Sequence, residues 1–375
     1  MGFQLTEEQI AALETPCLVI DVELARRNIA TMQKQADSAH VALRPHMKTH
    51  KMPFFAHMQI VAGAVGITCA KVSEAEVMAD GGIRDIFIAY PMVGHFRIRR
   101  ALALQKRVDR LILAVDSMAC AESLNEEAAI TGEILEVRLE IDTGARRTGV
   151  PMEKALTLAR RVAALPNLRL TGIYTFKSLL YRGEPTMDNE LAAQEEGVLM
   201  GTAAGLIRAA GIPLTDISAG SSPTGFAVAR TGKVTEIRPG TYIFGDLMLR
   251  KERVATPDSM AARLYATVVS TPAPDYAVID GGTKIFPSDV PINTPPAYHA
   301  AYAAVVGRED LCLARMYEEH GILTSTRGDT DLTVGEKIAL IPLHICTSVN
   351  LLNSVYLFDN NVLNVRKVDA RGMLI

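Results

Sequence analysis

The sequence predicts an α/β protein in which a (β/α)8 barrel of the TIM type is followed by a second, mainly β domain. Three observations lead to this prediction. Between residues 41 and 240, short runs rich in β-branched residues alternate with helical patterns. After residue 248 helical patterns become scarce, and strand-like runs follow one another with turns between them. A chain of 375 residues also exceeds one ordinary core, so a large domain and a smaller one are expected.

Each predicted barrel strand is short and apolar, and most of the segments between the strands have room for a helix and two loops. The strands are expected at residues 41–47, 66–70, 85–90, 110–115, 135–141, 170–176, 215–219 and 234–237. Parallel strands with this rhythm can also form an open doubly wound sheet, but a count of eight favours the closed barrel.

Capping residues mark where two of the helices begin. Asp21 can cap the helix that runs to residue 36, because its carboxylate can accept a free backbone N–H of the first turn. Ser73 and Glu76 have the spacing of a capping box, and Gly81 with Gly82 would end that helix.

The second domain is predicted to be mainly β, with no internal repeat and no low-complexity linker before it. Its strands are expected at residues 264–269, 277–280, 321–326, 337–349, 355–358 and 362–365. We therefore place the barrel at residues 16–248 and the β domain at residues 249–375, which residues 1–15 can join.

The composition describes a compact folded protein and argues against several kinds of partner. Hydrophobic residues make up 49% and charged residues 22% of the chain, and the net charge is −3. No dense basic stripe occurs, so nucleic acid is not an expected partner. The chain has no apolar stretch of about eighteen residues and no signal-like start, and its five cysteines lack CxxC spacing. We expect a cytoplasmic protein with reduced thiols and no membrane association.

The loops that follow the barrel strands are the expected place for function, because they converge on one mouth. The first predicted strand leads into residues 44–51, which read Arg-Pro-His-Met-Lys-Thr-His-Lys. Most lysines are solvated surface charges, but Lys48 has His46, His50 and Lys51 nearby in the sequence. Crowding by cations and partial desolvation both disfavour the ammonium form. Lys48 is therefore a candidate amine nucleophile that forms imines.

Two loops of small residues are candidates for binding a phosphate. Residues 220–225 read Gly-Ser-Ser-Pro-Thr-Gly after the seventh strand, and residues 238–241 read Arg-Pro-Gly-Thr after the eighth. Their backbone N–H groups and hydroxyls can surround a phosphate, and loops after strands seven and eight are the usual phosphate site of such barrels. One such turn alone is more often an ordinary turn, but the pair on adjacent strands favours a phosphate site.

His344 and Cys346 are a candidate metal-binding pair in the second domain. If residues 337–349 form a strand, residues i and i+2 face the same side, so an imidazole and a thiolate can converge on one ion. A buried cysteine and a hydrogen-bonded histidine are also common without any metal. Two protein ligands would leave open positions, as a catalytic metal site requires.

Together these motifs resemble those of the D-threonine aldolase and D-serine dehydratase family. The resemblance spans essentially the whole chain and is carried by four motifs: residues 44–51, Asp-Thr-Gly-x-x-Arg-x-Gly at 142–149, Arg-Pro-Gly-Thr at 238–241 and His344-x-Cys346. Members of this family are fold-type III pyridoxal-phosphate enzymes, related to alanine racemase through the barrel. The resemblance implies a pyridoxal 5′-phosphate cofactor, a divalent metal such as Mn, Zn, Mg or Co, and a homodimer.

The resemblance also implies a role for individual residues. Lys48 would carry the cofactor as a Schiff base, and Arg147 would lie near the cofactor ring oxygen or the substrate carboxylate. Lys177, in the loop after the sixth strand, would accept or donate the proton of the substrate hydroxyl. His344 and Cys346 would bind the metal. The other cofactor contacts are expected from His46, Tyr174, Ser221, Ser222, Thr224, Gly240, Thr241 and, facing the pyridine nitrogen, Arg238.

The sequence departs from the family in two places that bear on the reaction. The typical aldolase has Asn before the metal histidine and an Asn-Leu-His-Asp turn after it. Here Leu343 precedes His344, and residues 350–353 read Asn-Leu-Leu-Asn. After the sixth strand, residues 175–178 read Thr-Phe-Lys-Ser where aldolases tend to have Gly-His.

The resemblance implies a lyase that acts on a small D-3-hydroxy amino acid. Cleavage of the D-threonine aldolase type, to glycine and an aldehyde, is favoured because cationic neighbours would favour a neutral Lys177 that accepts the hydroxyl proton. A D-serine or D-3-hydroxyaspartate dehydratase, giving a 2-oxo acid and ammonia, is the first alternative.

Two further functions stay open on the same barrel. An amino-acid racemase would need an opposing tyrosine from the second domain. The candidates are Tyr265, Tyr276, Tyr298, Tyr302 and Tyr317. A cofactor-binding carrier without catalysis is the other, because a fold does not dictate a function.

Overall fold

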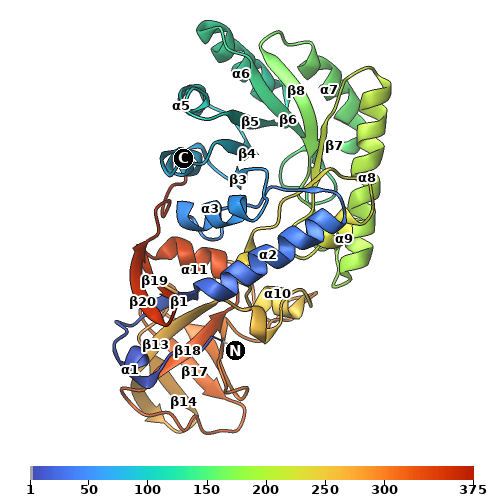
Figure 1. Cartoon of the computed structure of the whole chain (residues 1–375). Helices are drawn as coiled ribbons and strands as arrows, with labels where there is room; N and C mark the ends of the chain where they lie inside the picture. The colour runs from blue at the N-terminus through green and yellow to red at the C-terminus, as the bar shows by residue number, and fades with distance from the viewer. Residues whose placement is uncertain (1–2) are drawn as a thin grey trace. The chain divides into compact units, whose positions relative to one another are not determined.

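The computed structural model describes residues 3–375 and divides into two compact units. The first, called the barrel unit below, contains residues 30–48, 52–240 and 373–375. The second, called the β unit, contains residues 3–29, 49–51 and 241–372. Figure 1 labels the helices and strands of both. Among residues 3–375, no helix is both long enough and apolar enough to cross a membrane.

Parallel strands form the barrel unit, and they pair in the order β2-β12-β11-β8-β6-β5-β4-β3. Their bounds are β2 (Ala42–Leu43), β3 (Ile67–Cys69), β4 (Asp85–Pro91), β5 (Arg110–Val115), β6 (Leu135–Asp142), β8 (Leu168–Tyr174), β11 (Asp216–Ala219) and β12 (Glu236–Ile237). A parallel bridge between His46 and Thr68 joins the chain after β2 to β3, which closes the ring. The predicted (β/α)8 barrel is confirmed.

Helices follow the strands and lie outside them (Figure 1). They are α3 (Pro53–Val61), α4 (Val72–Asp80), α5 (His95–Gln105), α6 (Met118–Thr131), α7 (Ala155–Ala163), α8 (Asn189–Ala209) and α9 (Gly225–Ala229). Short elements interrupt two of the connections, namely β7 (Val150–Pro151), η1 (Met152–Lys154), β9 (Leu180–Tyr181) and β10 (Glu184–Pro185). The helix α2 (Val22–Ser38) leads into β2.

One of the two predicted helix starts is confirmed and the other is wrong. The carboxylate of Asp21 accepts the backbone N–H of Leu24 at 2.8 Å, so Asp21 caps α2. The capping box at Ser73 does not form, because the residue that precedes α4 is Lys71, whose side chain makes no cap. The hydroxyl of Ser73 donates instead to the carbonyl oxygen of Ile375 at 2.9 Å.

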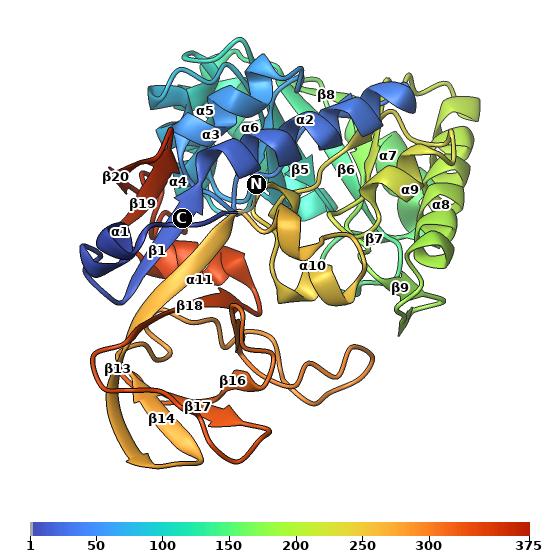
Figure 2. The same cartoon turned by 60° about the horizontal axis from the view of Figure 1, so that its bottom comes forward.

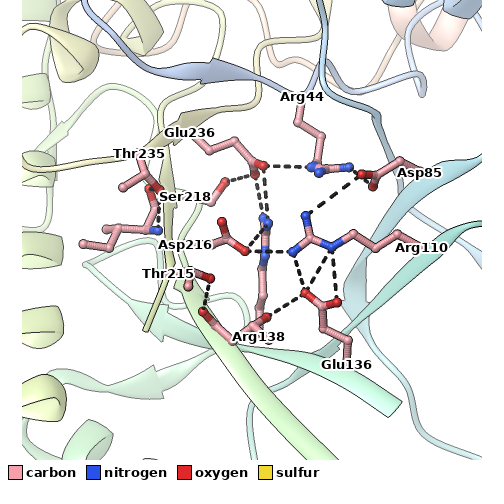
Figure 3. Close-up of polar contacts among 12 residues, drawn as sticks. Arg44, Asp85, Arg110, Glu136, Arg138, Thr215, Asp216, Ser218, Thr235 and Glu236 are labelled. Carbon is pink, nitrogen blue, oxygen red and sulfur yellow. Dashed lines mark hydrogen bonds and ion pairs between the residues drawn. The ribbon is translucent and has the colours of Figure 1, made fainter. Parts of the chain in front are cut away.

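The interior of the barrel combines an apolar cluster with a charged one. Phe87, Ile112, Ala114 and Tyr174 pack together with almost no exposure. Arginine and carboxylate side chains from or beside the starts of several strands form ion pairs across the interior (Figure 3). They are Arg44, Asp85, Arg110, Glu136, Arg138, Asp216 and Glu236.

The β unit is built on one continuous sheet with the order β14-β17-β16-β15-β18-β13-β1-β19-β20. The bounds are β1 (Cys17–Asp21), β13 (Ala262–Ala273), β14 (Tyr276–Ile279), β15 (Ala303–Val305), β16 (Leu311–Met316), β17 (Gly321–Ser325), β18 (Lys337–Pro342), β19 (Ser354–Asp359) and β20 (Val362–Lys367). Because β13 also pairs with β14, the strands from β13 to β18 close into a small barrel (Figure 2). The remaining three strands extend from β13.

Short helices complete the β unit. They are α1 (Glu7–Ala11), η2 (Thr241–Ile243), α10 (Leu247–Lys251), η3 (Pro257–Ser259) and α11 (Ile345–Leu351). The predicted second domain is therefore mainly β, as expected.

The β unit departs from the prediction at three points. The single strand predicted at residues 337–349 is wrong, because β18 ends at Pro342 and α11 begins at Ile345. The buried carboxylate of Asp246 accepts the backbone N–H of Ile345 at 3.2 Å, which satisfies a donor that a helix start leaves unpaired. Residues 16–29 lie in the β unit rather than in the barrel, since β1 pairs with β13 and β19. Strands β15 and β16 were not predicted.

Candidate active site

Lys48 and Arg147 lie on the same aromatic ring at the end of the barrel strands. The ammonium of Lys48 is 5.7 Å from the ring centre of Phe176, and the guanidinium of Arg147 is 4.4 Å from it. Neither cation lies within ion-pair distance of a carboxylate among residues 3–375. The backbone N–H of Lys48 donates to Nδ1 of His46 at 3.3 Å, and this hydrogen bond orients the imidazole of His46. The structure therefore brings together the two groups expected to act on cofactor and substrate.

The loop that carries Arg147 is held by its own backbone. Oδ1 of Asp142 accepts the backbone N–H groups of Gly144 and Arg146 at 2.9 and 3.0 Å. Gly149 ends the loop at φ +102°, and a Cβ there would lie 2.7 Å from the backbone nitrogen of Asp142. The position therefore requires glycine. The hydrogen bonds to Asp142 and the glycine at position 149 fix the backbone of the loop that carries Arg147. The side chain of Arg147 is exposed.

The two predicted phosphate loops are joined to each other. The backbone N–H of Gly240 donates to Oγ of Ser222 at 3.1 Å, so the loops after β11 and β12 meet. Ser221 adjoins this contact, and its hydroxyl lies 3.2 Å from that of Thr224. Hydroxyls and backbone N–H groups gathered in this way have the donor chemistry that a phosphate needs.

Thr224 supports this loop through buried hydrogen bonds. Its fully buried hydroxyl accepts the backbone N–H of Ser221 at 3.2 Å and donates to Glu196 at 3.2 Å. Glu196, on α8, also accepts the backbone N–H of Gly220 at 3.0 Å. Thr224 therefore shapes the turn, and its expected contact with the cofactor stays a prediction. Burial raises the pKa of Glu196. The sequence analysis did not identify this residue as part of the site.

Arg238 and Tyr174 lie in the interior of the barrel. The guanidinium of Arg238 donates to Oγ of Ser218 at 2.5 Å and to the carbonyl oxygen of Thr175. It also lies 5.2 Å from the ring centre of Tyr174. The hydroxyl of Tyr174 donates to Glu140 at 2.9 Å, and burial together with Glu140 raises the pKa of this phenol well above its usual value. Tyr174 is thus a neutral hydrogen-bond donor at neutral pH.

Lys177 is engaged by three acceptors after β8. Its side chain is fully buried, and its Nζ donates to the carbonyl oxygens of Leu180 and Ala192. It also pairs with the carboxylate of Glu195 at 2.8 Å. These contacts hold the loop between β8 and α8, and the catalytic role expected for Lys177 stays a prediction.

His344 and Cys346 lie together, although not on a strand as expected. His344 precedes the first residue of α11, and Cys346 is in its first turn. Nδ1 of His344 lies 2.6 Å from Oδ2 of Asp289. Burial alone would lower the pKa of His344, but Cys346 and Asp289 outweigh it and raise this pKa to about 11. The imidazole and the thiol therefore interact directly.

The sulfur of Cys346 is surrounded by hydroxyl groups. Sγ lies 3.1 Å from Oγ1 of Thr49 and 3.5 Å from Oγ1 of Thr241. The expected contact of Thr241 with the cofactor phosphate stays a prediction. Thr49 directly follows Lys48 in the sequence. The sulfur of Cys346 and the hydroxyls of Thr49 and Thr241 therefore form one hydrogen-bonded group.

The donor set fits a metal that has two protein ligands. Among the described residues, no group of three or more His, Cys, Asp and Glu side chains could hold a metal ion. His344 and Cys346 supply one imidazole and one sulfur. Because Nδ1 of His344 is engaged by Asp289, the other ring nitrogen is left for a metal. The sequence singled out the two candidate ligands but missed Asp289, which lies in the irregular segment between β14 and β15.

Comparisons with known proteins agree with this description of the fold. Residues 20–248 match the family model of the alanine racemase N-terminal domain, and residues 261–358 match that of a putative serine dehydratase domain. The chain is thus an enzyme of the lyase class built on the alanine racemase fold. It belongs to the family of D-threonine aldolases and D-3-hydroxyaspartate and D-serine dehydratases, which depends on pyridoxal phosphate.

Characterised relatives match nearly the whole chain. D-threo-3-hydroxyaspartate dehydratase of Delftia sp. (strain HT23) is 33% identical over 91% of this chain and 93% of its own. D-threonine aldolase of Arthrobacter sp. is 29% identical over 97% of this chain and 94% of its own. The solved structure of the Delftia enzyme superposes with a TM-score of 0.87 at 31% identity, covering 97% of this chain and 99% of that one. A cysteine-to-alanine variant of a D-threo-3-hydroxyaspartate dehydratase was solved in a metal-free form.

Proposed function

We propose that this protein is a pyridoxal-phosphate- and divalent-metal-dependent lyase that dehydrates D-3-hydroxy amino acids. The observation that carries the proposal is the placement of Lys48 and Arg147 on the ring of Phe176. A lysine that can form an imine and an arginine that can bind a carboxylate then act on one bound amino acid.

The residues of the barrel unit suit a phosphorylated aromatic cofactor. The amine of Lys48, which has no carboxylate partner among the described residues, would hold its aldehyde carbon. Ser221, Ser222 and the backbone of Gly240 would bind its phosphate, and Arg238 would face its ring nitrogen. When bound, the cofactor supplies an electron sink for the bond that breaks at Cα. Arg147 would orient the substrate through its carboxylate, because a guanidinium binds a carboxylate at two points.

The residues of the β unit suit a divalent cation. His344 and Cys346 would hold it, with Asp289 fixing the imidazole and the hydroxyls of Thr49 and Thr241 contacting the sulfur. Such a cation supplies a Lewis acid for the hydroxyl group of the substrate. The solved metal-free form of a D-threo-3-hydroxyaspartate dehydratase variant supports a metal in this family.

The contacts of the Lys177 side chain favour dehydration over aldol cleavage. Cleavage between Cα and Cβ requires a group that accepts the proton of the β-hydroxyl. Lys177 was the candidate, but its ammonium already donates to two carbonyl oxygens and pairs with Glu195. Loss of the hydroxyl group needs no such base. The similarity to the Delftia dehydratase points the same way.

Aldol cleavage is the second candidate, because similarity to D-threonine aldolase of Arthrobacter sp. extends over 97% of this chain. One experiment separates the two. Purified protein loaded with cofactor and Mn²⁺ or Zn²⁺ is incubated with D-threo-3-hydroxyaspartate, D-serine and D-threonine. Dehydration releases ammonia and a 2-oxo acid in equal amounts, whereas cleavage releases glycine and an aldehyde. Glycine and aldehyde without ammonia would reject dehydration.

A further inference from the structure

Arg238 differs from the other arginines inside the barrel. Arg44, Arg110 and Arg138 each form an ion pair with at least one carboxylate. Among residues 3–375, no carboxylate lies within ion-pair distance of Arg238. Its partners are the hydroxyl of Ser218 and the carbonyl oxygen of Thr175. A buried guanidinium without a direct counter-ion therefore depends on neutral groups for its position.

Ser218 connects this arginine to a buried carboxylate. Its hydroxyl oxygen lies 2.5 Å from Nη1 of Arg238 and 2.5 Å from Oε1 of Glu236. A guanidinium can only donate and a carboxylate can only accept, so the hydroxyl accepts from Arg238 and donates to Glu236. The hydrogen of the Ser218 hydroxyl therefore points toward Glu236. Figure 3 shows the contact between Ser218 and Glu236 within the larger cluster.

Glu236 is a rigid anchor for this contact. Arg138 donates to it at 2.6 and 3.3 Å, and Arg44 donates to it at 2.8 Å. Burial alone would raise the pKa of Glu236, but these two arginines outweigh it and hold the pKa far below its usual value. Glu236 and Arg238 are two residues apart around β12, so both side chains face the barrel interior.

We propose that Ser218 and Glu236 are positioning residues that hold the Arg238 guanidinium in the orientation in which it meets the cofactor ring. The inference rests on the proposed function, because it takes Arg238 as a cofactor contact. The ion-pair cluster fixes Glu236, Glu236 fixes the hydroxyl of Ser218, and that hydroxyl fixes one nitrogen of Arg238. The rings of Tyr174 and Phe87, 5.2 and 5.9 Å from the guanidinium, restrict its remaining freedom.

Ser218→Ala tests this inference, with Thr171→Ala as a matched control. The hydroxyl of Thr171 donates to Glu136 at 2.8 Å in the same cluster, and Glu136 makes no contact with Arg238. Ser218→Thr keeps the hydroxyl and serves as the rescue variant. Glu236 itself is left unchanged, because its loss would remove one of the two carboxylate partners of both Arg44 and Arg138. Each apo-protein is titrated with pyridoxal 5′-phosphate by absorbance, and its thermal midpoint is recorded.

We expect Ser218→Ala to weaken cofactor binding by about tenfold, the effect of one lost hydrogen bond to a charged group. Ser218→Thr should restore binding, and Thr171→Ala should bind as the unchanged protein does. If Ser218→Ala binds as tightly as Thr171→Ala while Arg238→Ala binds weakly, the positioning role is wrong and the proposed function stands. If Arg238→Ala also binds normally, Arg238 is not a cofactor contact, and both its proposed role and this inference are rejected.

Discussion

Oδ2 of Asp289 lies 2.6 Å from Nδ1 of His344, although the two residues are 55 positions apart in the chain. Asp289 stands in the irregular segment between β14 and β15, and His344 immediately precedes α11. The carboxylate fixes the ring orientation of the imidazole and the nitrogen that carries its proton. This contact connects a loop with no regular structure to the proposed metal site.

Asp289→Asn should lower the metal affinity of the protein. Carboxylates in this position typically contribute about 10- to 100-fold to the affinity of a metal site, because they orient the histidine and increase its basicity. The affinity for Zn²⁺ can be measured by competition with a chromogenic chelator, without any assay of activity. Asp275→Asn, at an exposed position in the turn between β13 and β14, is the control. Equal affinities for the two variants would show that Asp289 does not act on the metal.

Lys177→Met should destabilise the protein without changing which products it forms. The substitution removes the buried cation that pairs with Glu195 and that donates to two carbonyl oxygens. We expect a loss of about 3 kcal/mol in the free energy of unfolding, typical of a broken buried ion pair. Denaturant titration measures the loss, and product analysis measures the ratio of ammonia to aldehyde. A variant of normal stability that has lost its turnover would restore Lys177 as a catalytic residue.

Glu136→Gln should destabilise the protein at neutral pH and much less in acid. Burial raises the pKa of Glu136, but hydrogen bonds from Arg110 and Thr171 outweigh it, so the pKa is lowered in the folded state. A carboxylate with a lowered pKa contributes stability above its unfolded value, near 4.5, and loses it as the pH falls. We expect a difference of about 2 kcal/mol at pH 7. The thermal midpoints of the two proteins should differ most at pH 7 and should converge only as the pH falls below 4.5 and through the lowered folded-state pKa.

The strands and helices of the barrel could be predicted where local patterns in the sequence mark them. Short apolar runs identified the parallel strands, and Asp21 identified the start of α2 because a cap acts within one turn. The cluster around Glu236 could not be predicted, since its partners come from strands far apart in sequence. Nothing local in the sequence distinguishes a buried Arg138 from a solvated one.

The site shows the same division between local and long-range information. Lys48, Arg147 and the pair His344 and Cys346 stand in motifs that can be read from neighbouring residues. The partners that decide their chemistry, such as Asp289, come from other elements. Residues 337–349 were predicted as one strand because apolar residues recur throughout. The carboxylate of Asp246, which supports the helix start at Ile345, lies 99 positions earlier.

The central claim is that Lys48 binds the cofactor covalently, and borohydride reduction tests it most directly. Protein incubated with pyridoxal 5′-phosphate is reduced, digested and analysed by mass spectrometry, together with Lys48→Ala treated in the same way. Reduction converts an imine to a stable amine, so the modified residue can be located. We predict the phosphopyridoxyl group on the peptide that contains Lys48, and no stoichiometric modification of the variant. Stoichiometric modification of another lysine in both proteins would contradict the claim.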